Sequence, residues 1–378
     1  MTPLQIGVAA NGSLPLPWLA DSLARAAALA QAHALLIHGP AGVGHLEFAL
    51  LLAQAALCED VAAAAGTAGA GAGQGTATPR QSSLGCGHCA SCHLVVTRVH
   101  PDLLLLLPDA QRVQLGWVDD DDSKLGKAEA KPSREIKVEQ VRRAIAWAQQ
   151  TSGRGRGKVL VLHPADAMNT VAANALLKTL EEPPGRLRLL LTSADPERLL
   201  ATVRSRCQRL ALQLPGPADA LAWLQDQGLA DPGALLAGAG GSPLEALAWR
   251  DEGLSAALLA DLPRRVAAGD PAPLIGRPLP RVIDLLLKLA HDVQTLAAGG
   301  SARFYPDAKV PAGADLVALL GWQQALLRAA RHDEHPWNAA LLIESLVSQA
   351  AAVWAPAMAS SAPAGRRPAA GSSLHSRQ

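Results

Sequence analysis

Four of the five cysteines have the number and spacing that bind a metal ion. Cys86, Cys89 and Cys92 are separated from one another by two residues, and Cys58 lies earlier in the chain. Four thiolates make a closed tetrahedral zinc site that leaves no position for water. The sequence therefore predicts a structural Zn²⁺ in a module spanning residues 58–92, where metal binding would fold an otherwise loose loop.

Other chemistry for these cysteines stays open at this stage. A four-iron cluster uses the same two-residue spacing, but its run continues with a nearby fourth cysteine where this chain has Val95 and Val96. The remaining alternatives are a redox pair, free thiols, or a site in which His88 or His93 replaces one cysteine.

A glycine-rich loop follows the first apolar run and reads Gly39-Pro-Ala-Gly42-Val-Gly44-His45-Leu46. The order of strand, loop and helix is typical of a Walker A cradle, whose backbone N–H groups bind phosphates. A working cradle continues with a lysine for the phosphates and a Ser or Thr for magnesium, where this chain has His45 and Leu46. Because a mostly neutral imidazole and an apolar side chain replace neither group, we expect no productive ATP binding.

The apolar run 158–162 shows a parallel loss. A hydrolysing protein of this type would end that strand with an acidic pair that binds the metal and polarises water, and this chain has His163 and Pro164 there. Two motifs that fail in the same direction predict a nucleotidase-like fold without hydrolysis, and they oppose an autonomous ATPase.

The elements that must position these residues alternate between strands and helices. Short β-like runs cover residues 34–38, 103–107, 158–162, 187–192 and 208–212. Helical patterns lie between them, as at 138–150, where apolar residues recur at three- and four-residue spacing. The alternation predicts an α/β domain: a five-stranded parallel sheet with helices on both faces.

The composition changes after Pro215-Gly216-Pro217, where strand patterns stop. We predict an α/β domain at 1–213, a small helical domain at 214–256, an all-α domain at 257–354 and a disordered tail at 355–378. The Ala- and Gly-rich stretch 62–79 and the charged stretch 119–134 are predicted surface insertions.

Charge and hydropathy exclude several classes of protein. The 34 basic and 33 acidic residues leave a formal charge of +1, so no whole-chain field would attract nucleic acid or anionic lipid. Neither a membrane-spanning run nor a signal segment is evident, and we expect a cytoplasmic protein without membrane contact. The basic clusters Arg142-Arg143 and Arg154-Gly-Arg156-Gly-Lys158 are interpreted as solvated loops rather than DNA contacts.

Two further motifs carry a family resemblance. Asn174-Ala-Leu-Leu-Lys-Thr-Leu-Glu-Glu-Pro-Pro184 is predicted as a helix stopped by prolines, and the triplet Ser205-Arg206-Cys207 comes after it. With the four cysteines and the defective phosphate loop, residues from about 17 to 250 closely resemble the delta-prime family of bacterial DNA polymerase III clamp-loader subunits, which are AAA+ proteins.

The resemblance implies an AAA+ module, a helical lid and a C-terminal collar domain in a pentamer with motor (gamma/tau) and delta subunits. It implies that Arg206, within its Ser205–Cys207 motif, enters a neighbour's ATP site in trans as an arginine finger. Leu244 stands where motor subunits have an ATP-sensing arginine.

Such a subunit would have no activity of its own within a nucleotidyltransferase holoenzyme. It would meet primer-template DNA indirectly and be nucleoid-associated through the replisome. The alternative function is a zinc-stabilised nucleic-acid-binding AAA+-like protein outside the clamp loader.

Overall fold

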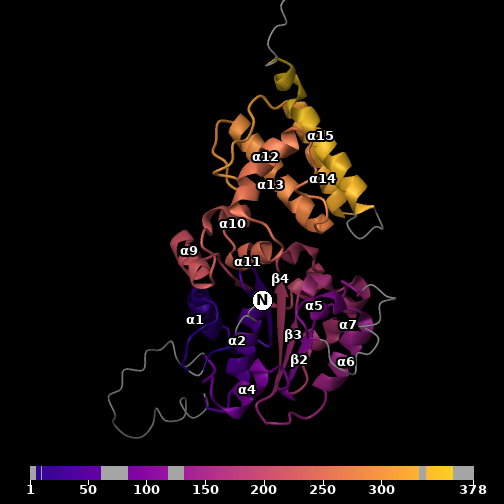
Figure 1. Cartoon of the computed structure of the whole chain (residues 1–378). Coiled ribbons are helices and arrows are strands. Elements are labelled where there is room, and N and C mark those ends of the chain that lie inside the picture. Colours follow the sequence, from indigo (N-terminus) through magenta and orange to yellow (C-terminus); the bar gives the residue numbers. More distant parts are fainter. Residues whose placement is uncertain (1–5, 10, 61–83, 118–131, 332–337, 361–378) are drawn as a thin grey trace, which may run out of the picture. The chain divides into compact units, whose positions relative to one another are not determined.

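The computed structural model describes residues 6–9, 11–60, 84–117, 132–331 and 338–360, with side chains to 354 (Figure 1). The predicted insertion at 62–79, most of the one at 119–134 and the end of the predicted tail lie outside these residues. None of the described helices combines the length and apolarity that a membrane crossing needs.

The strands form one parallel five-stranded sheet in the order β2-β3-β4-β1-β5. Their bounds are Ala34–His38 (β1), Leu103–Leu106 (β2), Lys158–Leu162 (β3), Leu187–Ser193 (β4) and Gln208–Ala211 (β5). The prediction of a parallel sheet is confirmed, with ends that differ by one residue at most in each strand. The central strands are nearly all apolar because helices cover both of their faces.

Helices from both sides enclose the sheet (Figure 1). The helices up to residue 226 are α1 (Ala20–Ala28), α2 (His45–Leu57), α4 (Ala90–Val96), α5 (Asp109–Gln114), α6 (Val138–Ala148), α7 (Thr170–Glu181), α8 (Ala201–Arg204) and α9 (Pro217–Asp226). In Figure 1, α1 and α2 lie on one side of the strands, and α6 and α7 lie on the other. The fold of this region is an α/β module with a five-stranded parallel sheet, as predicted.

The predicted proline-stopped helix corresponds to α7, which begins at Thr170, before the motif, and contains the motif as far as Glu181. Asn169 begins the helix because its side chain accepts a hydrogen bond of 2.9 Å from the N–H of Ala172. Leu176 and Leu180 are buried in the core, and Leu177 packs against that core in a partly buried position. The helix ends at Glu181, just before Pro183.

The chain divides into two compact units. The first comprises Met1–Trp223 with Gly241–Glu245, and the second comprises Leu224–Gly240 with Ala246–Gln378. Beyond β5 the described residues form helices: α10 (Gly233–Gly238), α11 (Pro243–Asp251), α12 (Ala256–Ala267), α13 (Leu279–Ala297), α14 (Leu316–Arg331) and α15 (Ala339–Ser360). The boundaries between lid and collar domains stay predictions, whereas α15 continues to Ser360, into the stretch predicted as a disordered tail.

Asp292 organises the core of the second unit. This wholly buried side chain accepts hydrogen bonds from the backbone N–H groups of Arg303, Phe304 and Tyr305, at 3.0, 2.8 and 2.8 Å. The Tyr305 hydroxyl then donates to the Leu285 carbonyl at 2.8 Å. One carboxylate therefore fixes the segment after α13 against that helix.

Asp292→Ala should lower the free energy of unfolding by about 3 kcal/mol, because it leaves buried N–H groups without an acceptor. The matched control is Asp284→Ala on the same helix, which removes a partly exposed carboxylate 2.7 Å from Lys288. That change should cost about 0.5 kcal/mol. Urea denaturation followed by circular dichroism would compare the two, and equal losses would contradict the role given to Asp292.

Candidate functional site

The glycine-rich loop keeps the backbone shape of a phosphate cradle between β1 and α2. Gly42 and Gly44 have φ values of 71° and 103°, in the left-handed region that favours glycine. A Cβ atom on Gly42 would lie 2.3 Å from Ser242 Oγ, and one on Gly39 would lie 2.6 Å from the Leu212 carbonyl oxygen. The glycines are therefore required by geometry, whatever the loop binds.

The side chains at the start of α2 do not supply charge to this loop. His45 is 6% exposed, and burial lowers its pKa to about 4 despite a hydrogen bond to the Gly39 backbone. Its Nε2 atom has no hydrogen-bond partner among the described residues. His45 is thus neutral at physiological pH, and the adjacent Leu46 is buried and apolar.

The end of β3 is also uncharged. His163 Nδ1 lies 2.7 Å from Thr192 Oγ1. Burial, with a smaller effect from His45, lowers the pKa of His163 to about 3. Asp166 lies just beyond, in a 3₁₀ turn at Ala165–Ala167, and its charge acts to raise the pKa of His45. The sequence motif gave no reason to single out Asp166.

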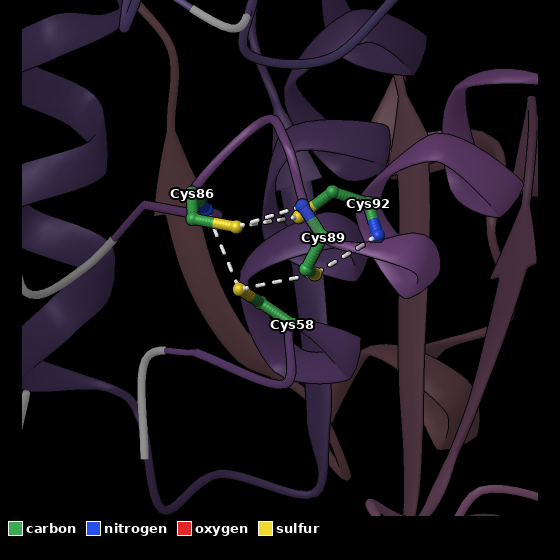
Figure 2. A group of neighbouring side chains, drawn as sticks. All are labelled: Cys58, Cys86, Cys89 and Cys92. Carbon is green, nitrogen blue, oxygen red and sulfur yellow. Dashed lines mark hydrogen bonds between the residues drawn. The ribbon is translucent and has the colours of Figure 1, made fainter. Parts of the chain in front are cut away.

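The four cysteines predicted to bind metal lie together (Figure 2). Their sulfur atoms are all within 4.8 Å of one another, with Cys58–Cys89 at 3.9 Å and Cys86–Cys92 at 3.8 Å. A tetrahedral zinc–thiolate centre with bonds of about 2.3 Å places its sulfurs about 3.8 Å apart. The cluster could therefore hold a metal ion, and its spacing suits zinc.

Backbone N–H groups surround the sulfurs. Those of Cys86, Cys89 and Cys92 donate to the sulfurs of Cys58, Cys86 and Cys89, at 3.4, 3.3 and 3.4 Å. Burial acts to raise the pKa of Cys89, but N–H groups of Cys92 and Glu59 outweigh it and lower that pKa to about 7. The same kind of burial raises the pKa of Cys86 to about 11. Donors of this kind stabilise thiolate ligands.

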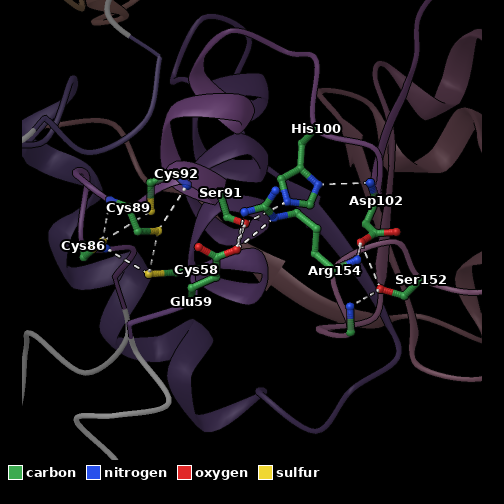
Figure 3. A network of polar contacts seen from close by, with 11 residues as sticks. Cys58, Glu59, Cys86, Cys89, Ser91, Cys92, His100, Asp102, Ser152 and Arg154 are labelled. Carbon is green, nitrogen blue, oxygen red and sulfur yellow. Dashed lines mark hydrogen bonds and ion pairs between the residues drawn. The ribbon is translucent and has the colours of Figure 1, made fainter.

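Polar contacts fasten the cysteine module to the sheet (Figure 3). Glu59, next to Cys58, accepts hydrogen bonds from Arg154 Nε at 2.8 Å and Ser91 Oγ at 3.0 Å. His100 Nε2 lies 3.1 Å from Ser91 Oγ. The loop that leads into β3 is therefore tied to both ends of the module.

Asp102 anchors that same loop. This buried carboxylate accepts hydrogen bonds from the N–H groups of Gly153 and Arg154 at 2.7 and 2.9 Å, and from Ser152 Oγ at 2.9 Å. Burial alone would raise the pKa of Asp102, but these donors lower it below its ordinary value. Lys158 is also buried, with Nζ 4.3 Å from the Trp147 ring centroid. The interpretation of this basic cluster as a solvated loop is wrong for Lys158, which is buried, whereas Arg154 stays exposed and pairs with Glu59.

The Ser205-Arg206-Cys207 motif lies just before β5, away from the phosphate loop. Arg206 donates from Nε to Glu181 Oε1 at 2.8 Å and from Nη1 to the Thr202 carbonyl at 2.8 Å. Its side chain is 33% exposed and borders a groove of about 680 Å³. Burial raises the pKa of the Cys207 thiol to about 11, so it stays protonated. The sequence motif that contains Glu181 did not predict its contact with Arg206.

The fold and the loop define an α/β module whose phosphate cradle lacks its charged side chains. The family described as DNA polymerase III, delta subunit, matches residues 19–215, just over half of the 378 residues, and the chain belongs to it. The resemblance inferred from the motifs is confirmed.

Individual relatives agree with this assignment. DNA polymerase III subunit delta' from Pseudomonas aeruginosa is 38% identical over 228 residues, covering 59% of this chain and 57% of the relative. The Escherichia coli K12 protein of the same name is 32% identical over 239 residues, covering 61% and 60%. The matched region thus spans less than two thirds of either relative. A solved gamma subunit-related protein from Thermotoga maritima covers 88% of this chain and 99% of its own, with 12% identity and a TM-score of 0.39.

Proposed function

We propose that the chain is a non-catalytic delta-prime subunit of the DNA polymerase III clamp loader, bracing a ring with motor and delta subunits. It lends Arg206 to a neighbouring ATP site. The observation that carries the proposal is the partly exposed arginine of the Ser-Arg-Cys turn in a chain of this family. Cytoplasmic location and indirect contact with primer-template DNA through the complex are part of the same proposal.

Sheet topology favours action in trans. Arg206 precedes β5, and the phosphate loop comes after β1, the parallel neighbour of β5. The N-terminal and C-terminal ends of parallel strands lie at opposite edges, and five residues of strand span about 16 Å. This separation supports a role for Arg206 at a phosphate held outside its own loop.

The chemistry is that of a fixed cation meeting developing charge. A guanidinium is permanently charged and donates in a planar fork, so it can stabilise the charge that spreads over a γ-phosphate during hydrolysis. The residues of this chain's own cradle cannot do so, because His45 is neutral and Leu46 is apolar. In this arrangement the neighbouring subunit binds the nucleotide, and this chain adds Arg206 to the neighbour's site.

For the cysteine cluster we propose a structural zinc ion. Cys58, Cys86, Cys89 and Cys92 would be its ligands, and Glu59 and Arg154 would fasten the folded module to the loop before β3. Four thiolates saturate zinc, so the metal would contribute folding free energy and no Lewis-acid chemistry.

Protein purified without chelators should contain about one zinc per chain, because four thiolates form one tetrahedral site. Cys89→Ser should abolish stoichiometric zinc and increase hydrogen exchange in the described part of 58–100 while the sheet stays folded. Cys207→Ser is the matched control, because this thiol lies outside the cluster and should leave the zinc content unchanged. Stoichiometric iron with a brown chromophore would contradict the assignment.

The chain alone should show no measurable ATP hydrolysis, and His45→Lys should not restore it. A lysine would return one charge, while the magnesium-binding hydroxyl at Leu46 and the acidic pair at His163 and Pro164 would still be missing. Turnover of radiolabelled ATP by highly purified protein measures this. Hydrolysis at the rate of a normal AAA+ motor would support an autonomous ATPase instead.

Arg206→Ala should leave zinc content and assembly intact while the reconstituted loader loses DNA-stimulated ATP turnover at one site and loads clamps at least about 10-fold more slowly. Arg206→Lys should behave like the alanine variant, since an ammonium lacks the planar fork. Arg198→Ala, in the turn before α8, is the control for loss of one nearby positive charge. Clamp loading at the parental rate by Arg206→Ala, or failure of the chain to co-purify with motor and delta subunits, would overturn the proposed function.

A further inference from the structure

Two motifs that the sequence presents separately meet in one ion pair. Glu181 is the first glutamate of the Leu-Leu-Lys-Thr-Leu-Glu-Glu-Pro-Pro motif, and Arg206 lies at the centre of the Ser-Arg-Cys triplet. Arg206 Nε and Nη2 both donate to Oε1 of Glu181, the former at 2.8 Å. The contact joins the end of α7 to the turn before β5.

The end of α7 is an unfavourable place for a carboxylate on helix grounds alone. Glu181 is the last residue of the helix, where exposed carbonyls carry partial negative charge and cations are preferred. The next residue, Glu182, is exposed and has no side-chain partner among the described residues. Since α7 gains nothing from acidity at this end, the pairing with Arg206 is what gives Glu181 a role.

Some N–H groups of the Arg206 guanidinium have hydrogen-bond partners among the described residues, and one N–H group of Nη2 has none. The guanidinium has five N–H groups. The one on Nε and one on Nη2 donate to Glu181, and one on Nη1 donates to the Thr202 carbonyl at 2.8 Å. A weaker contact of 3.4 Å runs from Nη1 to Ser205 Oγ. The second N–H group of Nη2 has no hydrogen-bond partner among the described residues, and the side chain is 33% exposed, which leaves this N–H for an incoming acceptor.

The neighbouring arginine is arranged differently. Arg204 pairs with Glu197 and donates to the Pro196 carbonyl at 3.1 Å, all within the segment that precedes β5. Its side chain is 18% exposed, and its buried Nε has no partner among the described residues. Arg204 therefore secures its own turn, whereas the partner of Arg206 comes from a different element, α7.

We propose that Glu181 is a positioning residue that fixes the orientation of Arg206. In that orientation the remaining N–H group of Nη2 meets a phosphate oxygen of a nucleoside triphosphate held by a neighbouring subunit. The inference rests on the proposed function of Arg206 and adds the residue that acts through it. An arginine that is already held in place loses little conformational freedom when it meets the phosphate. The ion pair should therefore raise the clamp-loading rate at saturating ATP.

The test is a double-substitution cycle in the reconstituted clamp loader, read as clamp-loading rate against ATP concentration. Glu181→Ala should lower the rate at saturating ATP about 5-fold and leave the half-saturating ATP concentration within about 2-fold, because nucleotide is bound by the neighbour. In the Arg206→Ala background, Glu181→Ala should have no further effect. Glu182→Ala is the matched control and should load clamps at the parental rate.

Glu181→Gln gives a second measure, because its amide oxygen still accepts N–H groups without the charge. Its rate should lie between those of Glu181→Ala and the parent, and it replaces the alanine variant if that variant assembles poorly.

If Glu181→Ala loads clamps at the parental rate while Arg206→Ala loads them slowly, the role of Glu181 is overturned and the proposed function stands. An equal loss from Glu181→Ala with and without Arg206 would also overturn it. If Arg206→Ala itself is parental, the proposed function fails and this inference fails with it.

Discussion

Parallel strand pairing is the constraint on which the arrangement of this protein depends. Because β1 and β5 run in the same direction, the residues before β5 and the residues after β1 lie at opposite edges of the sheet. The phosphate loop occupies one edge and Arg206 the other. A sheet of this kind can carry a glycine-rich loop and a partly exposed arginine at opposite ends of its strands, so that the two do not meet within one chain.

The distribution of charge depends on burial at each edge. Around the cradle, burial keeps His45 and His163 neutral, so the loop retains its shape without its electrostatics. Before β5, Arg206 is partly exposed and paired with a carboxylate, which keeps a permanent charge at the surface in a defined orientation. The first arrangement suits a structural loop, and the second suits a residue that contacts a partner.

The cysteine module shows how a small site depends on its attachment to a larger fold. Its four cysteines come from the end of α2, a connecting loop and the first turn of α4. Glu59 and Arg154 then join it to the loop before β3, and Asp102 holds that loop in turn. A metal ion could order the module, while the ion pair and the buried carboxylate determine where the module sits.

Residue identity and local pattern were enough to predict the kinds of chemistry available and most of the secondary structure. The four cysteines, the missing lysine and the apolar runs of the strands can be read from the sequence alone. Three pairings and burials emerged only once the chain was folded: Glu181 faces Arg206, Glu59 faces Arg154, and Lys158 is buried. They join segments far apart in the chain, and their existence depends on helix packing and strand order, which fix distances that local spacing does not encode.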